Sequence, residues 1–311
     1  MRRSLLVSAL AIVCGALTAH SQENPEDRPP DQVDLSSPEV VIPFQLVKGR
    51  PIVDVTLDGK GPFPFILDTG AGGTVIGADV ADELQLPKVG ETRIGDPIHP
   101  HGMVARTVRV GKVAIGGATF SPVVATAMDD PMLREHTSSR GVLGMPLFAN
   151  VLLTVDYKKS EIRVTRGELP DANGKDVVPY KSIMGIRVPI TVGVLELDAD
   201  LDTGSPAALS LPDTYMDRLP LEGKPVEIGR ARTVTSEFAV YAATLKGDVR
   251  IGGYRLENPS LRFNKLPIAN IGGEVLGRFA ITIDQKNRRI RFAPQEGEPH
   301  AGAASGGAAG R

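Results

Sequence analysis

The hydrophobic residues of this chain occur in short runs that are separated by turn-forming residues. Glycine and proline are abundant, with 34 and 25 residues. Beyond the N-terminal segment, no long apolar stripe has the 3.6-residue period of an amphipathic helix. Residues 51–57 alternate in the way of a half-buried strand, and Asp58-Gly59 then supplies a turn. These patterns predict an all-β protein.

A few segments depart from the strand pattern. Residues 79–84 and 213–219 are predicted to form short helices, and residues 92–111 and 231–247 are predicted to form hairpins that could overhang a cleft. Tight turns are expected at 155–159 and 283–287. Asp156 and Asp284 are therefore interpreted as turn-formers and not as catalytic groups.

The two halves of the chain repeat each other. Asp68-Thr69-Gly70 returns as Asp202-Thr203-Gly204, and flanking landmarks recur in the same order at nearly the same spacing. These landmarks pair Val41–Phe44 with Val177–Tyr180, Ile115–Gly117 with Ile251–Gly253, Val142–Gly144 with Val275–Gly277, and Thr154–Asp156 with Thr282–Asp284. A single Asp-Thr-Gly is a weak signal, because Asp and Gly are ordinary turn residues. Two copies inside a longer repeat are a strong one, and they predict that two carboxylates meet across a two-fold axis.

With these motifs the chain resembles the aspartic proteases over about residues 40–294. The stretch around the first motif is similar to the retroviral type, and the two-lobe layout is similar to pepsin. The resemblance implies two homologous β-barrel lobes with the active-site cleft between them. It also implies that a hydrophobic-hydrophobic-Gly segment passes behind each catalytic loop, namely Val142-Leu143-Gly144 and Val275-Leu276-Gly277. The second half is shorter after this segment, so the short helix expected there should be missing.

The resemblance assigns roles to the motif residues. Asp68 and Asp202 would be the catalytic pair, and Thr69 and Thr203 would hold the turns by bonding across the interface to the opposite lobe. Gly70 and Gly204 let the backbone approach the carboxylates, where a Cβ would intrude. Ser205 could bond an oxygen of the second aspartate, and Ala71 at the matching position could not.

Two carboxylates held about 3 Å apart cannot both ionise cheaply, and aspartic proteases are the usual example of this effect. One carboxylate, ionised, would take a proton from a water molecule, and the other would donate to the scissile carbonyl. This chemistry requires neither a metal nor another cofactor, and we expect none.

Other chemistries have weaker support in the sequence. The alternation of Asp198, Asp200 and Asp202 is like the start of a calcium loop, but such a loop would need Gly in place of Thr203 and Glu in place of Leu209. His99-Pro100-His101 lacks the further ligands of a recognisable metal site. The sequence contains no Gly-x-Ser-x-Gly, and its one cysteine, Cys14, lies in the N-terminal apolar run.

The termini and the composition divide the chain. Residues 1–21 have the basic start and short apolar run of a signal peptide, so we expect an exported protein, periplasmic or secreted, with no membrane span after cleavage. Residues 22–38 are predicted to be a disordered leader and 295–311 a disordered tail. The N-terminal lobe is expected at 39–167, a connector at 168–176 and the C-terminal lobe at 177–294.

Two function classes follow from the sequence. The first is an exported aspartic endopeptidase that acts on peptides or unfolded proteins. The second is a catalytically silent relative that uses its cleft to bind peptides or another protein. Both motifs are intact, which favours the enzyme. The net charge of −2 indicates no nucleic-acid partner, and two lobes in one chain predict a monomer.

Overall fold

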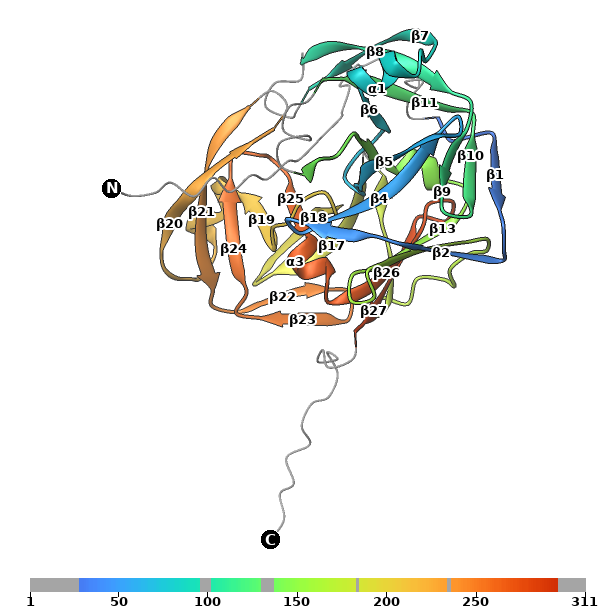
Figure 1. Cartoon of the computed structure of the whole chain (residues 1–311). Coiled ribbons are helices and arrows are strands. Elements are labelled where there is room, and N and C mark those ends of the chain that lie inside the picture. The colour runs from blue at the N-terminus through green and yellow to red at the C-terminus, as the bar shows by residue number, and fades with distance from the viewer. Residues whose placement is uncertain (1–27, 96–101, 130–136, 183–184, 234–235, 296–311) are drawn as a thin grey trace.

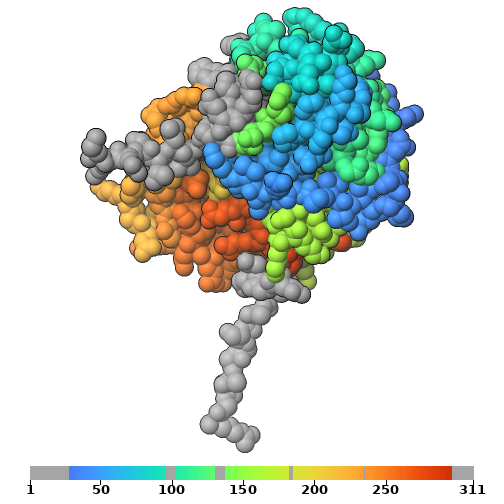
Figure 2. All heavy atoms as spheres, in the orientation of Figure 1, coloured from blue at the N-terminus to red at the C-terminus, as the bar shows by residue number. Residues whose placement is uncertain are grey.

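Strands dominate the fold. The computed structural model describes residues 28–95, 102–129, 137–182, 185–233 and 236–295. Their strands form three sheets of 11, 6 and 10 strands, which confirms the all-β prediction. The N-terminal half (blue to green) and the C-terminal half (orange) lie on different sides of the molecule (Figure 1), and their surfaces meet on the face shown in Figure 2.

The N-terminal half is built on the largest sheet, in the order β1-β10-β9-β4-β5-β12-β6-β11-β8-β7, with β3 paired to β4 beside this path. Its strands are β1 (Gln32–Leu35), β3 (Gln45–Val47), β4 (Arg50–Leu57), β5 (Lys60–Leu67), β6 (Val75–Gly77), β7 (Lys88–Ile94), β8 (Met103–Val110), β9 (Val113–Ile115), β10 (Ala118–Ser121), β11 (Val123–Met128) and β12 (Gly141–Leu143). The strand β5 leads directly into the first Asp-Thr-Gly.

The C-terminal half repeats this order as β23-β22-β17-β18-β25-β19-β24-β21-β20, with β16 paired to β17. Its strands are β16 (Lys181–Ser182), β17 (Ile186–Val192), β18 (Leu195–Asp202), β19 (Leu209–Pro212), β20 (Leu221–Arg232), β21 (Glu237–Leu245), β22 (Asp248–Ile251), β23 (Tyr254–Glu257), β24 (Ser260–Asn264) and β25 (Ala269–Gly272). Each of these strands has a counterpart in the first half. In the first half, β1 has no counterpart among the strands of the second sheet. The repeat in the sequence is therefore a repeat in topology.

A six-stranded sheet joins the halves in the order β15-β27-β26-β13-β14-β2. It contains β2 (Glu39–Pro43), β13 (Leu152–Asp156), β14 (Glu161–Thr165), β15 (Val177–Pro179), β26 (Phe279–Asp284) and β27 (Arg289–Pro294). At its centre β13 and β26 are antiparallel, Thr154 faces Thr282, and their Oγ1 atoms are 2.8 Å apart. Two matching threonines that pair with each other mark a two-fold relation between the halves.

The predicted closing turns follow β13 and β26. The backbone N–H of Lys159 donates to Asp156 Oδ1 at 3.1 Å, and that of Asn287 donates to Asp284 Oδ1 at 3.1 Å. These bonds satisfy turn amides that no strand partner reaches. Both aspartates therefore act as turn-formers.

Among the described residues, four short helices are assigned between the strands. They are α1 (Ala78–Glu83), the 3₁₀ helix η2 (Met145–Phe148), the 3₁₀ helix η3 (Asp213–Arg218) and α3 (Gly273–Leu276). The first and third lie where helices were predicted. The fourth corrects the prediction that the second half lacks the short helix that follows the hydrophobic-hydrophobic-Gly segment.

That correction follows from a wrong alignment of one landmark. In the first half β12 runs parallel to β5, with Leu143 opposite Leu67. In the second half the strand parallel to β18 is β25, with Ile271 opposite Leu201. The counterpart of Val142-Leu143-Gly144 is therefore Asn270-Ile271-Gly272, and Val275-Leu276-Gly277 belongs to α3 and its end. Gly144 precedes Thr154 by the same number of residues as Gly272 precedes Thr282, so nothing is missing.

Two predicted boundaries were also wrong. Part of the expected leader, Gln32–Leu35, forms β1 against β10, because Val33 and Leu35 alternate with polar residues and pack on the core. The second hairpin begins at Leu221, before residue 231, since β20 and β21 pair over their whole lengths with irregular register. The first hairpin, β7 with β8, begins at Lys88, and its residues 96–101 lie outside the described residues, as do 1–27 and 296–311.

One continuous hydrophobic core runs through both halves and the joining sheet. Edge-to-face aromatic pairs occur on each side, with ring centroids 5.4 Å apart for Phe120–Phe148 and 4.9 Å apart for Tyr254–Phe279. A core shared in this way fixes the two halves relative to each other. In the described part of the chain, no helix is long and apolar enough to cross a membrane.

The corrected alignment makes a prediction about glycines. A Cβ at Gly272 would collide with Ala207 O and lie 2.8 Å from Ser205 O, and one at Gly144 would collide with the backbone of Gly73. A Cβ at Gly277 would meet Gly273 O at 3.0 Å. We expect Gly144→Ala and Gly272→Ala each to lower the free energy of unfolding by about 1–3 kcal/mol or more.

Denaturant unfolding would measure the change, with Gly277→Ala as the matched control. The control should lose much less, because its backbone is helical and its Cβ contact is milder. A larger loss for Gly277→Ala than for Gly272→Ala would contradict the corrected alignment.

Candidate active site

The two Asp-Thr-Gly turns meet between the halves of the molecule. Asp68 follows β5 and Asp202 ends β18, and each strand is held from behind by a parallel neighbour, β12 or β25. The backbone N–H of Asp68 donates to Leu143 O at 3.1 Å. The two aspartates are 2% and 3% exposed. The structure therefore brings together two buried carboxylates from distant parts of the sequence.

Reciprocal threonine bonds lock the turns. Thr69 Oγ1 donates to Leu201 O at 2.6 Å, and Thr203 Oγ1 donates to Leu67 O at 2.6 Å. Each hydroxyl also accepts from the opposite threonine's backbone N–H, at 3.0 Å for Thr69 N and 3.1 Å for Thr203 N. Both threonines are fully buried, and the bonds cross between halves as the resemblance implied.

The motif glycines allow the carboxylates to approach the opposite turn. A Cβ on Gly204 would overlap the carboxyl group of Asp68, and a Cβ on Gly70 would lie 3.1 Å from Asp202 Cγ. Each carboxyl group thus sits against the glycine of the other motif, and the two carboxyl groups hydrogen-bond with each other. A side chain at Gly204 does not fit, and one at Gly70 would be tight against Asp202.

The donors to the two carboxylates differ. Asp68 Oδ1 accepts from the backbone N–H of Gly70 at 2.8 Å. Asp202 Oδ1 accepts from the backbone N–H of Ser205 at 2.8 Å, and Asp202 Oδ2 accepts from Asn270 Nδ2 at 2.6 Å. The prediction for Ser205 is corrected in one respect, because its backbone amide makes the bond to Asp202, while its hydroxyl accepts from Ala207 N at 3.4 Å.

Burial dominates the electrostatics of the pair. It raises the pKa of Asp68 well above the ordinary carboxyl value, and the neighbouring charge of Asp202 raises it further. Burial also raises the pKa of Asp202, while the bonds from Asn270, Asp68 and Ser205 oppose that rise. The pair therefore retains a proton where isolated carboxyls would lose theirs, and the environment of Asp202 is the more favourable to charge.

A buried arginine that the sequence analysis missed lies beside the pair. Arg50, at the start of β4, is 2% exposed, and its Nε donates to Gly204 O at 2.7 Å. Burial lowers the pKa of this guanidinium, and the charges of both aspartates oppose the change. The only sequence signal was a charged residue heading an apolar strand. The strand register makes Gly185 the counterpart of Arg50 in the second half. Glycine carries no charge, so these two matching positions place one cation beside the two aspartates.

A comparison with known protein families bears on the first half of this site. The aspartyl protease family model matches residues 53–147, which run from β4 through η2 and include the first motif. This part of the chain is similar to the aspartyl proteases. The family resemblance of the sequence is thereby confirmed, and with it a protease-like function. No curated protein matches the chain.

The two halves of the molecule differ in the side chains beside the motifs. In the first half Ile52, Ile66 and Val142 lie on three adjacent strands and are buried in one apolar cluster. The residues at the same strand positions in the second half are Arg187, Asp200 and Asn270. Arg187 Nε donates to Asp200 Oδ1 at 2.7 Å. A symmetric backbone thus carries an apolar set on one side and a polar set on the other.

The alternating aspartates of β18 have separate partners. Asp198 pairs with Lys181 at 2.7 Å, Asp200 pairs with Arg187, and Asp202 accepts from Asn270. Burial raises the pKa of Asp200 to about 6, although Arg187 opposes the shift. Their carboxylates therefore do not converge on one point as calcium ligands would. His99-Pro100-His101 lies outside the described residues.

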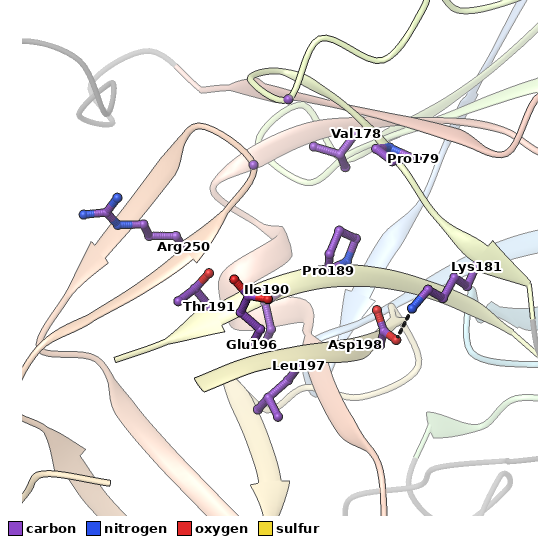
Figure 3. Close-up of a pocket in the computed structure, with 12 residues that line it drawn as sticks. Val178, Pro179, Lys181, Pro189, Ile190, Thr191, Glu196, Leu197, Asp198 and Arg250 are labelled. Atoms are coloured by element: carbon purple, nitrogen blue, oxygen red, sulfur yellow. Dashed lines mark hydrogen bonds and ion pairs between the residues drawn. The ribbon is translucent and has the colours of Figure 1, made fainter. Parts of the chain in front are cut away.

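A hollow of about 550 Å³ lies elsewhere in the C-terminal half, between β15, β17, β18 and β22. Figure 3 shows its apolar residues Val178 and Pro179 on one side and the Lys181–Asp198 ion pair near its edge. Among the described residues, its lining includes neither Asp-Thr-Gly motif. It is a separate surface feature of the protease.

The threonine lock makes a prediction about stability. Thr203→Val removes the hydroxyl that donates to Leu67 O and leaves that buried carbonyl without this donor. We expect the free energy of unfolding to fall by about 1–3 kcal/mol, measured by denaturant unfolding. Thr203→Ser keeps the hydroxyl and is the matched control. If Thr203→Val and Thr203→Ser lower the free energy of unfolding equally, the loss comes from the changed side-chain packing and not from the missing hydrogen bond.

Proposed function

We propose that this protein is an aspartic endopeptidase in which Asp68 and Asp202 together activate a water molecule. The observation that supports it is the pairing of the two buried carboxyl groups, held by reciprocal threonine bonds and flanked by glycines. Such a pair with one shared proton contains a base and an acid within reach of the same substrate.

In the proposed reaction the ionised carboxylate accepts a proton from water as the water oxygen attacks the peptide carbonyl carbon. The protonated carboxyl donates to the carbonyl oxygen as the tetrahedral intermediate forms. The carboxyl that took the water proton then donates it to the leaving amine, and a hydroxyl proton of the intermediate returns to the other carboxylate as the C–N bond breaks, which restores the singly protonated pair. No covalent enzyme intermediate is formed. The substrate class would be peptides or unfolded proteins.

We also propose that the chain is exported to the periplasm or secreted, on the basis of its basic, then apolar, N-terminal segment. N-terminal sequencing of the protein recovered from its producing cells should begin near residues 22–40. A chain that begins at Met1 would contradict cleavage.

The catalytic pair predicts the effect of removing either carboxylate. Asp68→Asn and Asp202→Asn should each lower kcat for hydrolysis of an unfolded protein or peptide by about 10²- to 10⁴-fold, because each removes half of one proton-sharing unit. Circular dichroism and thermal unfolding should show that both variants remain folded. Wild-type hydrolysis should survive EDTA, show a bell-shaped pH profile and stop with a statine-type inhibitor. Full activity in either pure variant would end the dyad hypothesis.

The same variants test whether one chain supplies both carboxylates. The continuous core supports a monomeric site, so mixing the Asp68→Asn and Asp202→Asn proteins should not restore activity. Activity of Asp202→Asn alone would indicate that first halves pair across chains. Activity that appears only on mixing would indicate a site built from the first half of one chain and the second half of another. Either result would contradict the monomer.

A further inference from the structure

Asn270 is the side chain that distinguishes the two carboxylates. It lies in β25, opposite Asp200 in the parallel register with β18, and its Nδ2 donates to Asp202 Oδ2 at 2.6 Å. Its Oδ1 is buried and has no hydrogen-bond partner among the described residues. The carboxylate is therefore the partner that holds this amide, and no wider side-chain network accounts for its placement.

The first half offers no equivalent donor. The residue at the matching position is Val142, which is fully buried and apolar. Asp68 has one backbone donor, the N–H of Gly70, and Asp202 has one, the N–H of Ser205, which lies one position further along its motif. The bond from Asn270 is thus an addition on one side of an otherwise matched pair. A hydrogen bond to a carboxylate is stronger when the carboxylate is ionised, so the addition favours a negative charge on Asp202.

The other charged and titratable groups near the pair do not provide the same distinction. The charge of Arg50 acts on both aspartates, and the buried phenol of Tyr157 feels both of their charges. Asp200 lies nearer to Asp202 in the sequence and would disfavour charge there, but Arg187 is paired with it. Among these groups, the neutral amide of Asn270 favours charge on one partner through a direct bond.

We propose that Asn270 is a positioning residue that assigns the roles in the pair, keeping Asp202 ionised as the base and leaving the shared proton on Asp68 as the acid. The proposal rests on the proposed proteolytic function for its catalytic meaning. The hydrogen-bond asymmetry itself stands on the geometry. Of the two carboxylates, the structure predicts that Asp202 is the one that receives the proton of the attacking water.

The pH dependence separates this role from a merely structural one. Asn270 stabilises the singly ionised pair relative to the neutral pair, so its loss should raise the lower of the two macroscopic pKa values. The upper pKa belongs to ionisation of Asp68 while Asp202 is already charged, so it should change little. Asn270→Val, which copies the first half, should shift the acid limb of kcat/KM upward by about one pH unit and leave the basic limb in place.

Asn270→Leu, which branches at Cγ as asparagine does, is the second variant in case valine disturbs folding. Asn264→Val is the control for loss of a largely buried asparagine in the same sheet, since Asn264 Oδ1 accepts from Leu266 N and does not contact the pair. Asn264→Val should lower the free energy of unfolding without moving the acid limb or the basic limb of the kcat/KM profile. Equal shifts of both limbs in the Asn270 variants, or a shift in the control as large as theirs, would overturn the assignment.

A titration that needs no substrate keeps the two proposals distinguishable. Carboxyl ¹³C NMR of aspartate-labelled protein, with signals assigned through Asp68→Asn and Asp202→Asn, should show the lower step of the pair at higher pH in Asn270→Val. If the wild type hydrolyses nothing yet this step moves, the proteolytic function fails and the role of Asn270 in placing the charge stands. If the step is unchanged, the role of Asn270 fails whatever the activity.

Discussion

Two carboxylates buried side by side are the constraint on which the rest of the structure depends. Taking carboxylates out of water is costly unless they share a proton and are hydrogen-bonded. Their raised pKa values mean that the folded protein holds protons which the unfolded chain releases above the ordinary carboxyl pKa. The stability that this protonation confers is therefore lost as the pH rises from the ordinary carboxyl pKa through the raised pKa values of the folded protein. The threonine bonds and the shared core must offset the remaining cost.

The two-fold arrangement follows from that constraint. To bring two equivalent turns into contact, the halves need the same strand order and a fixed axis between them, and both are present. The axis passes where Thr154 meets Thr282 in the joining sheet. Strands from both halves pair there, so displacement of one half would break a sheet as well as the contact between the motifs. The catalytic geometry is thus tied to backbone hydrogen bonds that lie outside the site.

Much of this was predictable because backbone requirements leave strong sequence signals. The repeated Asp-Thr-Gly, the matching Ile-Gly-Gly turns and the closing turns all occur where glycine or aspartate is needed for a turn, and their matching spacing predicted that the two halves repeat each other. The misaligned landmark has a physical reason. Asn270-Ile271-Gly272 does not match an apolar pattern because its first residue bonds Asp202, and the nearby Val275-Leu276-Gly277 of α3 does match. Arg50 left only a weak signal, a charged residue at the head of an apolar strand, because its bond to Gly204 reaches into the other half of the sequence.

The side chains that differ between the halves make the surroundings of the two carboxylates unequal. A pair with identical surroundings has two equivalent ways to place its proton, and an asymmetric substrate would then meet either arrangement equally often. Here the second half places polar residues at Arg187, Asp200 and Asn270, where the first half places isoleucine and valine. Arg50 likewise has a glycine as its counterpart. Because these replacements leave the backbone pairing unchanged, the repeat keeps the symmetry that brings the carboxylates together while its side chains make them unequal. A duplicated chain can evolve that inequality, whereas a symmetric homodimer of one such half carries the same residues on both sides.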